Sequence, residues 1–264
     1  MNWSFFEIDM LIVTIAFMTP VLLILWHSLW IERDDPSADQ QDQVTIRIGS
    51  GEPLTSSEPV SSDSRFASRL LMDASGIRSI AFDSLSHDGY RVFDLPLASP
   101  GGAVLGVSTH VRTITLEPAK FQRYIVEEGL AQPDAPPPSD PVTEAYSKYA
   151  KALIQNGAGS CVPWMKPLGL ELEIVPLVDE LRLQTSSEFM VTFQGQPVES
   201  FGLWYVRETG EKTLHQTNRE GRVQLKLDVP GSAVLKGIQM QTLDKPDLQR
   251  RSWWCSLCFR VSEH

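Results

Sequence analysis

The stretch L-E-L-E-I-V-P, residues 170–176, alternates apolar and charged side chains and ends at a proline. Successive side chains of a β-strand point to opposite faces, so this alternation predicts a strand. Similar short stretches follow, separated by turn pairs such as Gln194-Gly195: E-F-M-V-T-F (188–193), G-L-W-Y-V-R (202–207), G-R-V-Q-L-K-L (221–227) and S-L-C-F-R-V (256–261). We therefore predict an antiparallel β-sandwich over residues 168–264.

The region before this sandwich also has a strand-like pattern. V-T-I-R-I-G-S-G-E (44–52), R-S-I-A-F-D-S (78–84) and G-G-A-V-L-G-V-S-T-H-V (101–111) alternate between turn-rich pieces. A small N-terminal β domain is expected over residues 36–116.

Two helices are predicted between the β regions, over residues 117–157. Pro118 suits a first helical turn, and Gly129 suits a left-handed helix stop. A proline-rich linker, residues 131–140, follows. Asp140 then resembles a helix N-cap, and apolar residues recur at helical spacing before Asn156: Val142, Tyr146, Tyr149, Ala150, Leu153 and Ile154. Their aromatic face is expected to pack onto a β domain rather than to stack on a ligand.

The segment from residue 10 to residue 31 carries no fixed charge and follows a short tail, residues 1–9. It is long enough for one helix across a hydrocarbon core of about 30 Å. Trp26 and Trp30 suit an interfacial aromatic belt. We predict a single-pass anchor in the cytoplasmic membrane, with the soluble part outside the cytoplasm. The alternative is a cleaved signal peptide, which ordinarily has a basic start and small residues before the cut; Leu25 and Trp26 precede His27 instead.

The composition limits the classes of function. The formal charge is −10, from 33 acidic and 23 basic residues. Phosphate binding needs a basic face, so nucleic acid is not an expected partner. The sequence contains no H-E-x-x-H, no phosphate loop and no G-x-S-x-G, and no enzymatic activity is predicted.

The cysteines and most histidines are predicted to have ordinary structural roles. Cys255 and Cys258 lie three apart, so in a strand their thiols point to opposite faces, and both are expected to be buried; Cys161 is expected in a loop. His87, His110, His215 and His264 are scattered and are not expected to be ligands. The acidic pairs Asp34-Asp35 and Glu127-Glu128 are expected to be solvated.

Several segments together carry a family resemblance: H-S-L-W-I-E (27–32), L-E-P-A-K-F-Q-R-Y-I-V-E-E-G-L (116–130), E-A-Y-S-K-Y-A-K-A-L (144–153), and G-L-E-L-E-I-V-P (169–176) followed by T-N-R-E-G-R-V (217–223). In this order they resemble the domain-of-unknown-function 4198 family of exported bacterial proteins, some of which are linked to nickel or cobalt uptake. The C-terminal part, from G-Q-P-V (195–198) onward, is also similar to transthyretin-like accessory sandwiches.

The resemblance implies one candidate metal ligand, His27. In the family this histidine usually follows a cleavable signal, so its imidazole and a new α-amine would chelate one nickel, cobalt or copper ion. Two features depart from that pattern: the small residues before His27 are absent, and Gln239 stands where the family has a late histidine.

Two functions are therefore expected. The first is a membrane-anchored envelope accessory protein that presents a transition metal to an uptake system, with the bilayer and a transporter as partners. The alternative is a metal-free module that binds an envelope protein or a polysaccharide.

Overall fold

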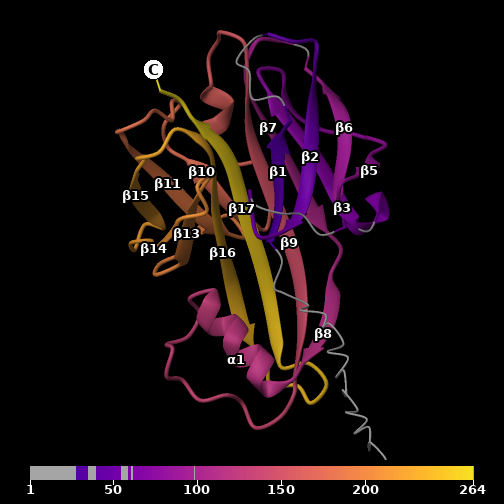
Figure 1. The fold of residues 1–264 in the computed structure, drawn as a ribbon, viewed down its shortest axis with the longest axis vertical. Helices are drawn as coiled ribbons and strands as arrows, with labels where there is room; N and C mark the ends of the chain where they lie inside the picture. Colours follow the sequence, from indigo (N-terminus) through magenta and orange to yellow (C-terminus); the bar gives the residue numbers. More distant parts are fainter. Residues whose placement is uncertain (1–27, 35–39, 55–58, 61, 98, 264) are drawn as a thin grey trace, which may run out of the picture.

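The structure is a computed structural model that describes residues 28–34, 40–54, 59–60, 62–97 and 99–263. Three β-sheets make up most of it, which confirms the predicted mainly β architecture (Figure 1). The central one is the long sheet of nine strands. Its members are β3 (Phe66–Asp73), β4 (Gly76–Ser79), β7 (Gly101–Thr109), β8 (Arg112–Leu116), β9 (Val142–Asn156), β13 (Gly202–Arg207), β14 (Lys212–Gln216), β16 (Gly231–Thr242) and β17 (Arg250–Val261).

Two four-stranded sheets pack on opposite faces of the long sheet. The N-terminal sheet contains β1 (Ser28–Arg33), β2 (Gln43–Gly51), β5 (Leu85–His87) and β6 (Tyr90–Pro96). The C-terminal sheet contains β10 (Leu172–Pro176), β11 (Ser186–Phe193), β12 (Gln196–Pro197) and β15 (Arg222–Lys226). Two 3₁₀ turns, Asp63–Arg65 and Val162–Met165, join strands.

Side chains of β17 show how one strand separates the two cores. Trp253, Cys255 and Leu257 point into the core beneath the C-terminal sheet. Cys258, on the other face, belongs to the core beneath the N-terminal sheet. The alternation follows from the two-residue period of a strand and confirms that the two cysteine thiols do not converge.

The single α-helix among the described residues, α1 (Pro118–Glu127), covers the lower part of β16 and β17 (Figure 1). Phe121 and Tyr124 are buried against Ile238 and Trp254 in a third apolar cluster. Tyr124 stacks on Trp254, with ring centroids 5.4 Å apart. The helix ends where Gly129 adopts a φ of 74°, as its sequence predicted.

The second predicted helix is wrong, because residues 142–156 form the strand β9. β9 lies in the middle of the long sheet, where it pairs with β17 in parallel and with β7 and β8 in antiparallel. Both of its faces are covered, so apolar residues occupy successive positions and imitate a helical pattern. Because β9 and β17 are neighbours, the long sheet includes strands from both predicted β regions.

The predicted membrane helix is wrong for its last four residues. Residues 28–31 begin β1, which pairs with β2, and Trp30 is fully buried in the core instead of lying at a membrane surface. Gly49 lies directly under its ring: a Cβ there would come within 2.4 Å of Trp30. Residues 1–27, including Trp26, lie outside the described residues. In the part of the chain that the structure describes, no helix is long and apolar enough to cross a bilayer.

Candidate functional site

The predicted metal ligand, His27, lies outside the described residues, as does His264. The other three histidines are far apart in the fold. His87 is exposed in β5 beside Asp88, His110 follows β7, and the His215 ring in β14 contacts the hydroxyl of Thr213 at 2.9 Å. Within the described ranges, no three histidine, cysteine or acidic residues form a group that could hold a metal ion.

The three cysteines are free and buried. Cys161 donates to the side-chain oxygen of Gln155 at 2.8 Å, and burial raises the pKa of its thiol to about 11. Burial also raises the pKa of the Cys255 and Cys258 thiols.

We expect all three thiols to resist a thiol-specific reagent in the folded protein at about pH 8, because the reactive thiolate is disfavoured and the reagent has no access. Unfolding in urea should release three reactive thiols. The measurement is the absorbance of the reagent with and without urea. Fast labelling of any thiol in the folded chain would contradict the burial described above.

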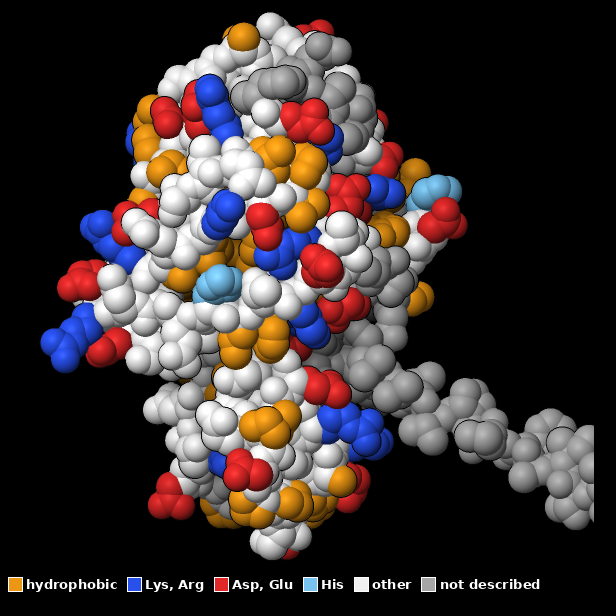
Figure 2. All heavy atoms as spheres, turned by 60° about the vertical axis from the view of Figure 1, so that its left-hand side comes forward, with side chains coloured by type: hydrophobic (Ala, Val, Ile, Leu, Met, Phe, Trp, Pro, Cys, Tyr) orange, Lys and Arg blue, Asp and Glu red, His pale blue; other side chains and the backbone are white. Residues whose placement is uncertain are grey.

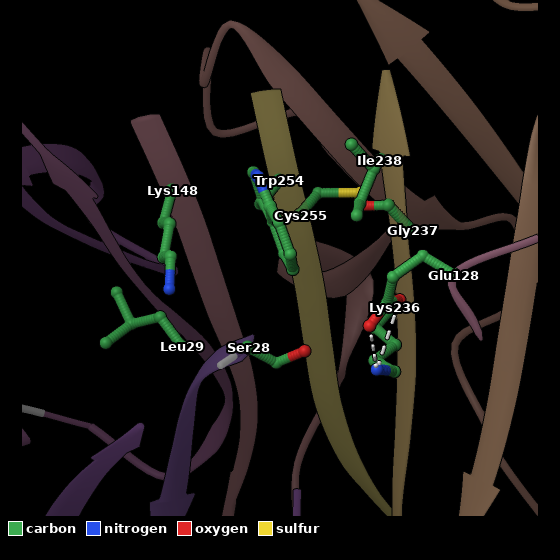
Figure 3. Close-up of a pocket in the computed structure, with 9 residues that line it drawn as sticks. All are labelled: Ser28, Leu29, Glu128, Lys148, Lys236, Gly237, Ile238, Trp254 and Cys255. Atoms are coloured by element: carbon green, nitrogen blue, oxygen red, sulfur yellow. Dashed lines mark hydrogen bonds and ion pairs between the residues drawn. The ribbon is translucent and has the colours of Figure 1, made fainter. Parts of the chain in front are cut away.

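Glu128 was expected to be solvated, but its side chain is buried at the end of α1. Its carboxylate accepts hydrogen bonds from the Lys236 ammonium at 3.1 and 3.2 Å, across 108 residues of sequence. The pair belongs to the lysine pocket, a hollow where α1 and β1 meet on the long sheet (Figure 3). Its lining residues are Ser28, Leu29, Glu128, Lys148, Lys236, Gly237, Ile238, Trp254 and Cys255.

Two lysines enter the lysine pocket from either side of Trp254. Lys148 comes from β9 and Lys236 from β16, and β17 with Trp254 lies between them (Figure 3). The Lys148 ammonium is 5.2 Å from the centroid of the Trp254 ring. The pKa of Lys148 is lowered to about 7: burial lowers it most and the nearby Arg65 also lowers it, whereas Glu128 and Glu144 raise it.

The lysine pocket has no space wide enough to hold a water molecule. Ser256 closes it further, since its hydroxyl donates to the carbonyl of Leu29 at 2.5 Å. A substrate has no room here. The pocket therefore fastens α1 and β1 to the long sheet.

A second polar cluster lies under α1. The Glu144 carboxylate accepts hydrogen bonds from the hydroxyls of Tyr124 (3.2 Å) and Ser252, and Trp254 donates to Ser252 at 3.1 Å. Burial raises the pKa of Glu144, and the hydrogen bonds oppose that rise. The second carboxylate oxygen of Glu144 is buried and has no hydrogen-bond partner among the residues that the structure describes.

The lowered pKa of Lys148 predicts a pH dependence of stability. The unfolded chain binds this proton up to a pKa of about 10.5, whereas the folded chain releases it near 7, so stability should rise with pH between these values. Between about pH 7 and 8.5 the gain is about 1–2 kcal/mol.

We expect a Lys148→Met variant to lack this gain. Urea unfolding of both proteins at the two pH values measures it, and the difference between the proteins removes the contribution of other groups. Equal pH dependence in both would show that Lys148 titrates normally.

The groove beside α1 is wider and open. Its volume is about 650 Å³, and it lies between α1, the segment 198–202 and the lower part of β16. Apolar residues, such as Ile125 and Met240, are the most numerous in its lining, which also includes three amide side chains, Gln132, Gln216 and Gln239. The sequence singles out Gln239 because it replaces a family histidine. Its side chain lies in this groove, together with the two other amides.

A third hollow, of about 800 Å³, lies at the opposite end of the molecule, lined partly by Cys161 and Trp164. Its lining includes the loops 157–160 and 179–182. On the face shown in Figure 2, acidic and basic side chains are interspersed and form no continuous basic band. Both open hollows have polar side chains on strands, and the groove beside α1 is the candidate because it also contains Gln239, the position that the sequence singles out.

Comparison with known proteins gives one family match. The sequence model of the family described as "Domain of unknown function (DUF4198)" matches residues 27–237. No curated protein matches the chain.

Three solved structures are distantly similar to this chain. The fibronectin(III)-like modules of Clostridium thermocellum CbhA are 9% identical, with 88% of this chain and 94% of that chain covered and a TM-score of 0.21. Salmonella alpha-2-macroglobulin reacted with methylamine is 11% identical, with 89% and 16% covered and a TM-score of 0.22. The Bacillus anthracis TIE protein is 9% identical, with 89% and 41% covered and a TM-score of 0.18. These TM-scores are too low to assign a shared fold.

Proposed function

The chain belongs to the DUF4198 family, and we propose that it is a non-enzymatic binding module of the cell envelope. One observation carries the proposal. The open groove beside α1 is lined mainly by amides and apolar side chains, which recognise a partner, whereas the buried charged groups of the lysine pocket lie in a space without room for a substrate. The transthyretin-like character of the C-terminal sandwich belongs to the same proposal, since such sandwiches serve as accessory domains.

The envelope location rests on the sequence. The uncharged stretch of residues 10–27, before β1 begins, favours a membrane-directed segment, either an anchor or a signal. A partner reached from this location would be another envelope component.

A test of the groove uses a photo-crosslinking amino acid, benzoylphenylalanine, in place of Gln239. The matched control replaces Gln224, an exposed glutamine of β15 on the C-terminal sheet. In the native host we expect ultraviolet light to produce one defined crosslinked product from position 239 and none from position 224. The same products from both positions, or none from either, would argue against the groove as the binding site.

A second candidate function is the presentation of a transition metal by His27. The position of Ser28, the residue after His27, favours this function. Ser28 is buried and begins β1, so the strand that follows His27 is held in place by the fold. An imidazole and an α-amine are ligands that nickel and copper prefer.

For a chain that begins at His27, we expect a His27→Ala variant to bind nickel at least about tenfold more weakly, because the imidazole ligand is lost. Calorimetric titration with nickel chloride measures the affinity. His87→Ala, a change of an exposed histidine, is the control and should bind nickel as the parent does. Equal affinities in all three chains would remove His27 from the site.

A further inference from the structure

The lower part of β16 is an open edge of the long sheet. β13 pairs with β16 only from Ala233 to Gly237. The next five residues, Ile238 to Thr242, pair with β17 on one side, and on their other side no described strand follows. Alternate N–H and C=O groups of an unpaired strand edge point outward, so this edge is a template for a further strand.

The groove beside α1 runs along this open edge. Four of its lining residues, Ile238, Gln239, Met240 and Thr242, belong to the edge itself. Ile238 and Met240 lie on the same side as α1, whereas Gln239 faces the other side, because side chains alternate along a strand. A strand in the groove would therefore meet apolar residues on one face and an amide on the other.

The edge lacks the features by which sheets protect their edges. Natural edge strands carry lysine or proline, or are covered by another element. β15, at the edge of the C-terminal sheet, carries Arg222 and Lys226, and β14 carries Lys212. The segment Ile238 to Thr242 has no charged residue and no proline. The segment therefore carries no side chain that would block the addition of a further strand.

Charges stand at the two ends of the groove. Arg250 pairs with Thr242 at the lower end, where its guanidinium lies 5.6 Å from the centroid of the Phe121 ring. Glu199 lines the groove beside Phe201, near the upper end, where Gly237 approaches Phe201. The five edge residues span about 17 Å, the length of a strand of about five residues.

We propose that this groove binds an extended peptide segment of a partner protein, which adds to β16 as a strand and continues the line of β13. The segment alternates apolar residues, directed toward α1, with polar ones, and carries an acidic residue beside Arg250. This proposal rests on the binding function proposed above and names its partner. Main-chain hydrogen bonds to β16 supply the affinity, and the contacts with α1 and Arg250 supply the specificity.

The test uses the full chain in a mild detergent and two hexapeptides, DTVTVT-amide and TVTVTD-amide, each with fluorescein attached to its N-terminal amine. Their acidic residue reaches Arg250 in an antiparallel or a parallel strand, respectively. Fluorescence anisotropy should show binding of one peptide at least about tenfold tighter than the other. N-methylation of alternate backbone nitrogens on the better peptide should weaken it at least about tenfold, because the strand can no longer donate hydrogen bonds.

The side chain of Arg250 provides a second readout. Arg250→Gln should weaken the better peptide about tenfold, whereas Arg222→Gln, on the exposed edge of β15, should leave its affinity unchanged. Equal binding of the N-methylated peptide, or no binding of either peptide, would overturn the strand-addition proposal. Sedimentation that shows a dimer joined through this edge would overturn it as well, because a second copy would then be the occupant.

These outcomes differ from failure of the proposed function. A crosslink at position 239 without peptide binding would leave a binding module whose ligand is not an extended peptide. If neither a crosslink at position 239 nor peptide binding is observed, both the proposed binding site and its proposed ligand are wrong.

Discussion

The Glu173→Gln variant is expected to lose about 3–5 kcal/mol of unfolding free energy, because it leaves a buried ammonium without its countercharge. Glu173 in β10 and Lys151 in β9 are each only 1% exposed, and their charged atoms lie 2.6 Å apart. The carboxylate also accepts hydrogen bonds from the backbone N–H groups of Leu168, Gly169 and Leu170. A single acidic side chain thus joins β9, β10 and the preceding loop.

Urea unfolding in a mild detergent measures this loss. The matched control is Glu188→Gln, which breaks an ion pair with Arg222 at the surface and should cost no more than about 1 kcal/mol. Burial lowers the pKa of Lys151 while Glu173 raises it, so removal of Glu173 should lower the pKa further. The deficit of the variant should therefore shrink as pH rises, since a neutral amine no longer needs a countercharge. A deficit as small as that of the control would show that this pair is not buried.

The second large effect is expected from Trp30→Ala, at about 3–5 kcal/mol. The Trp30 ring is fully buried above Gly49 and meets Tyr90 edge to face, with centroids 6.3 Å apart. Its removal would leave a cavity between the N-terminal sheet and the long sheet. A residue that only marked a membrane surface would have no such effect on the folded domain.

Thermal unfolding and urea unfolding of the full chain check this value. Leu85→Ala is the control, since Leu85 in β5 is 76% exposed and its loss should change the free energy of unfolding by less than about 0.5 kcal/mol. Similar stability of the two variants would place Trp30 outside the core and restore the predicted helix through Ile31.

Strands β11 and β15 of the C-terminal sheet could be predicted because each has one buried face. β15, R-V-Q-L-K, alternates exposed and buried residues without exception. β9 could not, since a strand with neighbours on both faces loses that alternation. In a helix Lys148 and Lys151 would share one exposed face; in β9 they point to opposite faces and each enters a different buried cluster. The wrong secondary structure thus concealed both lysines.

The lysine pocket and the groove beside α1 were missed for a related reason. Glu128, Lys148 and Lys236 come together only through the parallel pairing of β9 with β17, which no local pattern indicates. The edge of β16 is open below Gly237 because β13 begins at Gly202. This depends on the register between two strands that are distant in sequence. The sequence draws attention to Gln239 because a family histidine is replaced there. Its position in the groove depends on the strand pairing of β16, which the sequence alone does not show.

The open edge of β16 is tested most directly by amide hydrogen exchange of the free chain. In the paired segment from Ala233 to Gly237, both sides of β16 have neighbours, and all amides should exchange slowly. In Ile238 to Thr242, alternate amides should exchange at least about tenfold faster, because only every second N–H is directed toward β17. Slow exchange of all five would mean that the edge is already covered, and the groove would not be available to a partner strand.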